Sequence, residues 1–175
     1  MKSLKHVSER GIVLKKHKLP NQNVSLTVFT EFSGKIYLFA YGVRTITSKR
    51  LSHLETGNYL SISYKNEDGR LYLSETELIY GYSKVKDNPT RLEKMYTALL
   101  FLQKILPENE PEVDVFNVTL EYFKELNNKD VRVNQEEDFI GTCLIRLGYI
   151  DESTQTQQNF DVYEFVRQLI NLKLR

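Results

Sequence analysis

Residues 34–51 read GKIYLFAYGVRTITSKRL, and the first part of this stretch is the clearest guide to the fold. Side chains from Lys35 to Tyr41 alternate in character along the chain. One face would carry Ile36, Leu38 and Ala40, and the other would carry Tyr37, Phe39 and Tyr41. Because successive side chains of a strand point to opposite faces, this alternation predicts a strand with one face in a core.

Four further segments of the N-terminal half have the same period of two. They are Gly11 to His17, Val24 to Thr30, Tyr59 to Tyr64 and Leu71 to Tyr82. Turn sequences separate several of them, LPNQN at 19–23 and NEDG at 66–69. Closely spaced strands with no helix between the early ones are typical of a small antiparallel barrel. We therefore predict a five-stranded barrel domain over residues 1–86.

The apolar period changes to that of helices after Lys86. Asn88 and Pro89 are a typical helix start, and Pro107 would end that first helix. A second helix is expected from about Glu110 to the sequence NNKD, and a third should end at Gly148. A polar linker at 153–159 would precede a fourth helix from about Phe160. Residues 87–175 are thus predicted to form a helical bundle domain, so the fold class is α+β.

Charge is divided unevenly between these two halves. Residues 1–86 contain fourteen Lys and Arg and seven Asp and Glu, a net charge of +7. Residues 87–175 contain ten and sixteen, a net charge of −6, although the whole chain is close to neutral at +1. A basic, strand-rich half is expected of a nucleic-acid-binding protein, whereas the acidic half should not lie along a phosphate backbone.

Several classes of protein do not fit the composition. A single cysteine leaves no internal disulfide and no multi-cysteine zinc site. The first ten residues lack the apolar run of a signal peptide, and no stretch approaches the roughly 18 apolar residues of a membrane helix. We expect a cytoplasmic protein that has no membrane contact.

Taken in order, segments of both halves resemble the RecO family of bacterial recombination mediators. In the barrel they are GIVLKK (11–16), LTVFTEFSGKIYLFAYGVR (26–44), SKRL (48–51) and LYLSETEL (71–78). In the helices they are RLEKMYTALLFLQKILPENEP (91–111), VFNVTLEYFKELNN (115–128) and EEDFIGTCLIRLGYI (136–150). The likeness covers roughly residues 1–150 and is strongest between 11 and 51.

The resemblance implies an N-terminal OB barrel followed by a helical domain. It also implies binding of single- and double-stranded DNA, annealing of complementary strands, and work with RecR and the single-strand-binding protein SSB to load RecA. Many members carry a four-cysteine zinc module, whereas this chain has its polar linker after Leu147-Gly148-Tyr149. The chain therefore looks like a short form without that module, and no cofactor is expected.

Candidate DNA-binding residues follow from charge and from the strand pattern. Phosphate contacts are expected from the basic loop, Arg44, Lys49 and Arg50, because guanidinium and ammonium groups bind phosphate oxygens. Further cations of the barrel are Lys15, Lys16, Lys18 and Lys35. For Lys15 and Lys16 the alternative is a solvated surface, since exposed lysines are common.

Aromatic side chains beside the basic loop are candidates for stacking on bases. Tyr37 and Tyr41 would point outward next to that loop, where OB barrels bind single strands on exposed rings. The alternative is packing against the helical domain, which suits Phe39 because it has no polar tip. Within the helical half, Arg91, Lys94 and Lys104 are candidates for binding the acidic tail of SSB, as the resemblance suggests; the alternative is a solvated scaffold.

No catalytic pattern is present. His6, His17 and His53 lack the spacing of metal ligands, Cys143 lies on an apolar helix stripe, and no Gly-rich phosphate loop exists. We therefore expect no catalytic residues and no metal site. The leading hypothesis is a non-catalytic DNA-binding and annealing mediator. The alternative is a protein-interaction adaptor whose basic barrel binds an acidic partner, with DNA affinity incidental.

Overall fold

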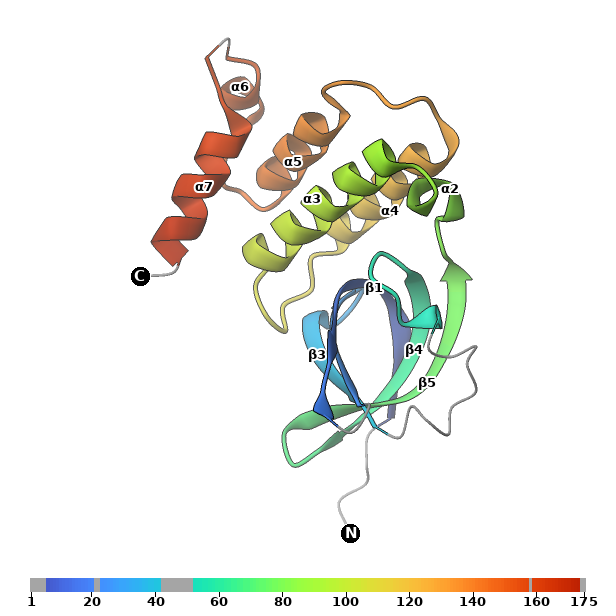
Figure 1. The fold of residues 1–175 in the computed structure, drawn as a ribbon. Coiled ribbons are helices and arrows are strands. Elements are labelled where there is room, and N and C mark those ends of the chain that lie inside the picture. Colours follow the sequence, from blue (N-terminus) through green and yellow to red (C-terminus); the bar gives the residue numbers. More distant parts are fainter. Residues whose placement is uncertain (1–5, 21–22, 42–51, 158, 174–175) are drawn as a thin grey trace. The chain divides into compact units, whose positions relative to one another are not determined.

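The computed structural model describes residues 6–20, 23–41, 52–157 and 159–173. The chain divides into two compact units, which are drawn as ribbons in Figure 1. The barrel unit comprises residues 1–82 and 106–111, and the helical unit comprises residues 83–105 and 112–175. The domain boundary expected between residues 86 and 87 stays a prediction.

Five strands form the barrel unit. They are β1 (His6–Lys18), β2 (Val24–Thr30), β3 (Gly34–Ala40), β4 (Tyr59–Glu67) and β5 (Arg70–Tyr80). The barrel is closed in the order β1-β2-β3-β5-β4, so the predicted five-stranded barrel is confirmed. All neighbouring strands are antiparallel except β3 and β5, which run parallel and pair only through Leu38–Leu71 and Phe39–Tyr72.

The long strand β1 joins two sides of the barrel. Its first part, His6 to Ile12, pairs with β4, and its second part, Gly11 to Lys18, pairs with β2. A Cβ atom added at Gly11 would lie 2.6 Å from the Val28 side chain, so a residue without a side chain is needed at this crossing. The register then shifts between Val13 and Lys15, which is a β-bulge that increases the bend of the strand.

The barrel core consists of side chains that point inward from β1 to β4 together with Leu54, and partly buried residues such as Leu71 and Leu73 of β5 pack against it. Ile36, Leu38 and Ala40 are at most 2% exposed, which confirms the predicted inner face of β3. The other buried members are Val13, Val24, Leu26, Val28, Leu54, Leu60, Ile62 and Tyr64. Each fully buried aliphatic side chain stabilises the fold by roughly 1.5–3 kcal/mol relative to an exposed one, so this cluster holds the barrel closed.

Turn residues connect β4 with β5 as the sequence predicts. Asp68 and Gly69 have φ angles of 51° and 82°, a conformation that favours glycine and tolerates aspartate. The Gly69 amide donates a hydrogen bond to the Asn66 side chain at 3.1 Å. A two-residue loop of this kind fixes the register of the two strands.

Within the described residues, the helical unit contains four long helices, as predicted, and two short ones. The long helices are α3 (Pro89–Ile105), α4 (Val113–Asn128), α5 (Gln135–Arg146) and α7 (Val162–Lys173). The short helices α2 (Ser83–Lys86) and α6 (Glu152–Gln155) were not expected. The linker prediction at 153–159 is thus wrong for its first residues, because the Asp151 carboxylate accepts the Thr154 amide at 2.7 Å and starts a helical turn there.

Predicted caps are present at two helix ends. The Asn88 side chain accepts the Arg91 amide at 3.1 Å, and Pro89 is the first residue of α3. After α5, Gly148 has a φ of 73° and the Tyr149 amide donates to the Leu144 carbonyl at 2.9 Å. None of the helices in the described ranges is long and apolar enough to span a membrane.

Candidate nucleic-acid interface

Strand register brings basic and aromatic side chains into rows on the outer surface of the barrel. Lys15 of β1 pairs with Thr27 of β2, which pairs with Tyr37 of β3. In the next row His17, Ser25, Phe39 and Tyr72 follow one another across β1, β2, β3 and β5. Paired residues on neighbouring strands point to the same side of a sheet. Thr27 and Ser25, which have small side chains, therefore lie between the basic residues of β1 and the aromatic residues of β3.

Three aromatic rings contact one another on the outer face of β3 and β5. The ring centroids of Phe39 and Tyr41 are 6.2 Å apart with an interplanar angle of 17°, and those of Tyr41 and Tyr72 are 5.5 Å apart. Phe39 and Tyr72 are 6.2 Å apart, so each ring contacts the other two. Tyr41 is 49% exposed, whereas Phe39 and Tyr72 are half-buried. We call Phe39, Tyr41 and Tyr72 the aromatic platform.

The aromatic platform adds to the expectations from the sequence. Phe39 contacts Tyr41 and Tyr72 within the barrel unit, and the alternative that it packs against the helical domain stays a prediction. Tyr72 was not among the predicted site residues. Its alternating position in LYLSETEL placed it on the outer face of a strand, but only the β3–β5 register shows which strand it neighbours.

The predicted lysine cluster at 15–18 does not share one face of β1, because side chains alternate along the strand and the bulge between Val13 and Lys15 sets which of them point outward. Lys15 lies on the outer face in the row of Tyr37, and it is exposed. Lys16 and Lys18 pair with Leu26 and Val24, whose side chains point into the core, so these two lysines lie at the end of the barrel on the inner side. Burial lowers the pKa of Lys16, an effect that the nearby Glu55 partly opposes.

Other predicted cations differ in their availability. Lys35 is 6% exposed on β3, so its ammonium group is not presented to a phosphate, and we leave it out of the interface. Arg44, Lys49 and Arg50 lie outside the described residues. In the sequence Arg44 is three residues after Tyr41, the exposed member of the aromatic platform.

Tyr37 has a partner that the sequence did not indicate. Its hydroxyl donates a hydrogen bond to the Glu108 carboxylate at 2.7 Å, and Glu108 belongs to the part of the barrel unit that follows α3. This hydrogen bond, with burial, raises the pKa of Tyr37, because the carboxylate favours the protonated phenol. Tyr37 is still 47% exposed, but its polar tip is held by an acid.

Two of the three cations proposed for partner binding already have contacts within the helical unit. The Arg91 guanidinium donates to the Leu126 carbonyl, and the Lys94 ammonium donates to the Val133 carbonyl at 3.2 Å. Lys94 also lies 3.7 Å from the Glu136 carboxylate. These contacts connect α3 with α4 and with the segment before α5. Lys104 is exposed, and within the described ranges no ion pair involves it.

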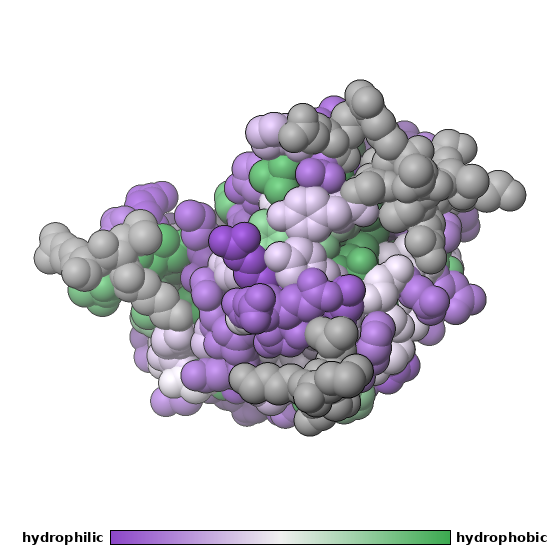
Figure 2. Space-filling view, turned by 90° about the horizontal axis from the view of Figure 1, so that it is seen from below, coloured by the Kyte–Doolittle hydropathy of each residue, from purple (hydrophilic) through white to green (hydrophobic). Residues whose placement is uncertain are grey.

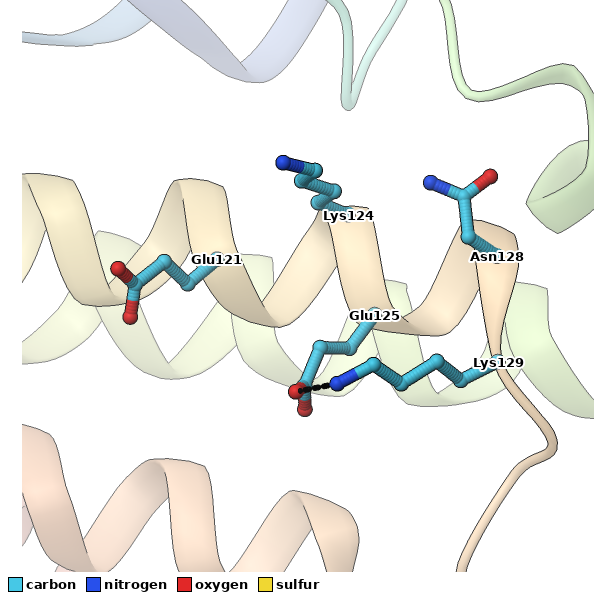
Figure 3. Close-up of a pocket in the computed structure, with 5 residues that line it drawn as sticks. All are labelled: Glu121, Lys124, Glu125, Asn128 and Lys129. Carbon is cyan, nitrogen blue, oxygen red and sulfur yellow. Dashed lines mark hydrogen bonds and ion pairs between the residues drawn. The ribbon is translucent and has the colours of Figure 1, made fainter.

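A surface hollow on α4 carries charges of both signs. It is lined by Glu121, Lys124, Glu125, Asn128 and Lys129 (Figure 3). Figure 3 shows Glu125 and Lys129 pointing toward one another, and their charged atoms are 2.6 Å apart. Because the ammonium of Lys129 is already paired, this hollow has little excess positive charge for an anionic ligand.

No group of metal-binding side chains assembles in the described part of the chain. Cys143 is fully buried, and burial raises the pKa of its thiol, so little reactive thiolate forms. Across residues 6–20, 23–41, 52–157 and 159–173, no three His, Cys, Asp or Glu side chains converge as a metal site requires. Glu75 and Glu77 are exposed on β5 opposite Ser63 and Ser61.

Exposed apolar side chains occur in both units. The face shown in Figure 2 is largely hydrophilic, with smaller hydrophobic areas between the polar residues. The most exposed large apolar residues are Phe32, Leu100, Val133 and Leu172. They come from a turn of the barrel unit and, in the helical unit, from α3, from the segment before α5 and from α7.

Comparison with known proteins gives a consistent family. Residues 1–82 match the family described as "Recombination protein O N terminal". The chain is 30% identical over 116 residues to the DNA repair protein RecO of Thermodesulfovibrio yellowstonii, an alignment that covers 66% of this chain and 46% of the relative. It is 29% identical over 122 residues to the DNA repair protein RecO of Prosthecochloris aestuarii, covering 69% and 46%. The matched part thus corresponds to about half the length of these relatives.

Proposed function

This chain is a RecO-type protein, and from that premise we propose that its barrel unit binds DNA without sequence preference and without catalysis. We further propose that the protein takes part in DNA repair and recombination, where it anneals complementary strands and assists RecA loading together with RecR and SSB. Both single- and double-stranded DNA are proposed ligands.

The aromatic platform beside Lys15 and His17 is the observation that carries this proposal. Every nucleobase has a π face, so Tyr41, exposed next to Phe39 and Tyr72, can stack on bases of any sequence. Lys15 lies on β1, which is separated from β3 and its rings by β2, and a phosphate of the DNA chain whose base stacks on Tyr41 would pass there. Arg44, Lys49 and Arg50 follow Tyr41 in the sequence and would add further phosphate contacts.

Annealing requires no chemistry from the protein under this proposal. A cationic surface that neutralises phosphates on two strands lowers their mutual repulsion and raises their local concentration. The net charge of +7 on residues 1–86 supplies such a surface, whereas the net charge of −6 on residues 87–175 does not.

Removing two rings of the platform tests the proposal directly. Base stacking contributes roughly 1–3 kcal/mol per base, so Tyr41→Ala combined with Tyr72→Ala should weaken binding of a fluorescent oligothymidine by at least tenfold. Tyr96→Ala is the control, because Tyr96 is likewise half-exposed, at 50%, but belongs to α3 of the helical unit. Equal affinities for the double variant and the control would reject the platform as the binding site.

The adaptor hypothesis remains a second candidate because exposed tyrosines next to lysine also suit protein partners. The two functions separate in an annealing assay with complementary oligonucleotides, run with and without the acidic SSB tail peptide. Binding of the peptide without any acceleration of annealing would favour the adaptor.

A further inference from the structure

The segment Leu106–Pro111 connects α3 with α4 but belongs to the barrel unit, and we call it the acidic strap. Its backbone runs along β3, where Glu108 forms a parallel bridge with Lys35. The Asn109 amide donates to the Lys35 carbonyl at 3.0 Å. Asn109 has a φ of 58°, a left-handed conformation that asparagine adopts more readily than most residues.

Two further contacts fix the acidic strap on the barrel. Gly34 has a φ of 72°, and a Cβ atom built on it would lie 2.0 Å from the Glu110 carbonyl oxygen, so the strap backbone lies directly against Gly34. The Glu108 carboxylate accepts the Tyr37 hydroxyl at 2.7 Å. Backbone and side-chain contacts therefore hold the strap at the end of β3 where the strand begins.

The acidic strap brings negative charge to one end of the outer face. Glu108 and Glu110 are both exposed, and no salt bridge to either is found among residues 6–20, 23–41, 52–157 and 159–173. Tyr41 is four residues from Tyr37, which is about 13 Å along a strand. Since charges in physiological salt are screened over about 8 Å, the carboxylates act on phosphates near Tyr37 and only weakly on those beside Tyr41, the exposed ring of the aromatic platform.

We propose that the acidic strap ends the path of DNA on the barrel. A strand stacked on the aromatic platform is repelled from the Lys35 end of β3 and leaves the surface before it reaches the β2–β3 turn. Tyr37 then anchors the strap instead of stacking on a base. This inference rests on the proposed function, since it assigns one boundary of the same DNA site. Bases of the DNA beyond that boundary stay off the protein surface and are accessible for pairing.

The test removes the two charges and keeps the shape of the side chains. In the double variant Glu108→Gln and Glu110→Gln, a carboxamide oxygen can still accept the Tyr37 hydroxyl. Two charges about 10 Å from a phosphate in water should change affinity about fourfold, so long oligothymidines should bind about fourfold more tightly at low salt. The gain should fall below about twofold at high salt. In a length series, the affinity of the variant should reach its plateau at a longer oligonucleotide.

A matched variant separates this local effect from net charge. Glu93→Gln with Glu121→Gln removes the same charge from exposed positions on α3 and α4 and should leave both affinity and plateau length unchanged. An equal gain in this control, or no gain in the strap variant while the wild type binds DNA, would overturn the strap proposal and leave the proposed function standing. If the wild type itself binds no DNA, both proposals are wrong.

Tyr37 provides an independent readout. If it anchors the strap, Tyr37→Ala should not weaken binding of single-stranded DNA, in contrast to the platform variants Tyr41→Ala and Tyr72→Ala. A loss of fivefold or more for Tyr37→Ala would show that this ring stacks on a base and would overturn the assignment.

Discussion

The Tyr64 hydroxyl donates a hydrogen bond of 2.5 Å to the carboxylate of Glu9, which is buried at 7% exposure. The other oxygen of the same carboxylate accepts the amides of Phe32 and Ser33 at 3.0 and 3.1 Å. One side chain of β1 thus holds both β4 and the turn between β2 and β3. A buried carboxylate is tolerated here because its hydrogen bonds replace those it would make with water.

Glu9→Gln should lower the free energy of unfolding by about 2 kcal/mol, because hydrogen bonds to a neutral carboxamide are weaker than those to a carboxylate, and the Tyr64 hydroxyl would have to accept from the new NH2 group instead of donating. Tyr64→Phe should cost about 1–2 kcal/mol, and the double variant less than the sum of the two, since both remove the same contact. Urea unfolding followed by circular dichroism measures the free energy of unfolding of each variant. Ser63→Ala is the control, because it removes only an exposed hydrogen bond to Ser8, and its free energy of unfolding should stay close to that of the wild type. If the double variant loses as much as the two single variants together, Glu9 and Tyr64 do not stabilise the fold through one shared contact.

The barrel should also lose stability in alkaline solution. Burial and the hydrogen bond to Glu9 raise the pKa of Tyr64 above its usual value of 10.0, and burial raises that of Tyr82. The folded state therefore keeps protons that the unfolded chain releases, so stability present below pH 10.0 is lost as the pH rises above it. Unfolding free energies measured from about pH 9 to about pH 11 should fall, and Tyr64→Phe should make the fall less steep. Identical slopes for both proteins would exclude Tyr64 as a cause.

How far the sequence predicts this barrel is clear from β3. The alternation from Lys35 to Tyr41 predicts the strand and its inner face, because that pattern is local. It does not predict that Tyr72 completes the aromatic platform, since Phe39 and Tyr72 become neighbours only through the parallel closure of the barrel. Nor does it show which of the lysines at 15–18 point outward, because that depends on a bulge before Lys15 whose position has no distinct sequence signal.

The acidic strap shows a second limit. Pro107 ends α3 as expected, and the residues after it read as a plain connection between two helices. Their contacts with Gly34, Lys35 and Tyr37 join positions about seventy residues apart, so no periodicity reveals them. The burial of Lys35 is a further case, because local sequence gives no sign that a lysine on the outer face of β3 is buried.

The basic loop provides a test of phosphate contact that does not depend on its conformation. Replacing Arg44, Lys49 and Arg50 together by Ala should weaken binding of single-stranded DNA by more than tenfold. The slope of log affinity against log salt, expected at roughly −3 to −4 if four to six phosphates are contacted, should become less negative by about 2.

The matched control for the basic loop removes three exposed cations of the helices, Lys104, Lys124 and Arg146. This variant has the same net charge as the loop variant and should keep the slope of the wild type. A flat salt response of the wild-type protein would count against phosphate contact altogether, and equal losses for the two triple variants would assign the effect to net charge.

Two glycines in left-handed conformations allow the cost of the strap contact to be measured against simple backbone strain. Gly34 and Gly69 have φ angles of 72° and 82°, so alanine at either position should cost about 1–2 kcal/mol from strain alone. At Gly69 nothing lies within 4 Å of the added Cβ, and the loss should stop there. At Gly34 the new atom meets the Glu110 carbonyl at 2.0 Å, so Gly34→Ala must also displace the strap and should cost clearly more. The urea midpoints of the two variants compare their stabilities directly. If Gly34→Ala loses no more stability than Gly69→Ala, the strap moves away without cost and is not held as firmly as its contacts indicate.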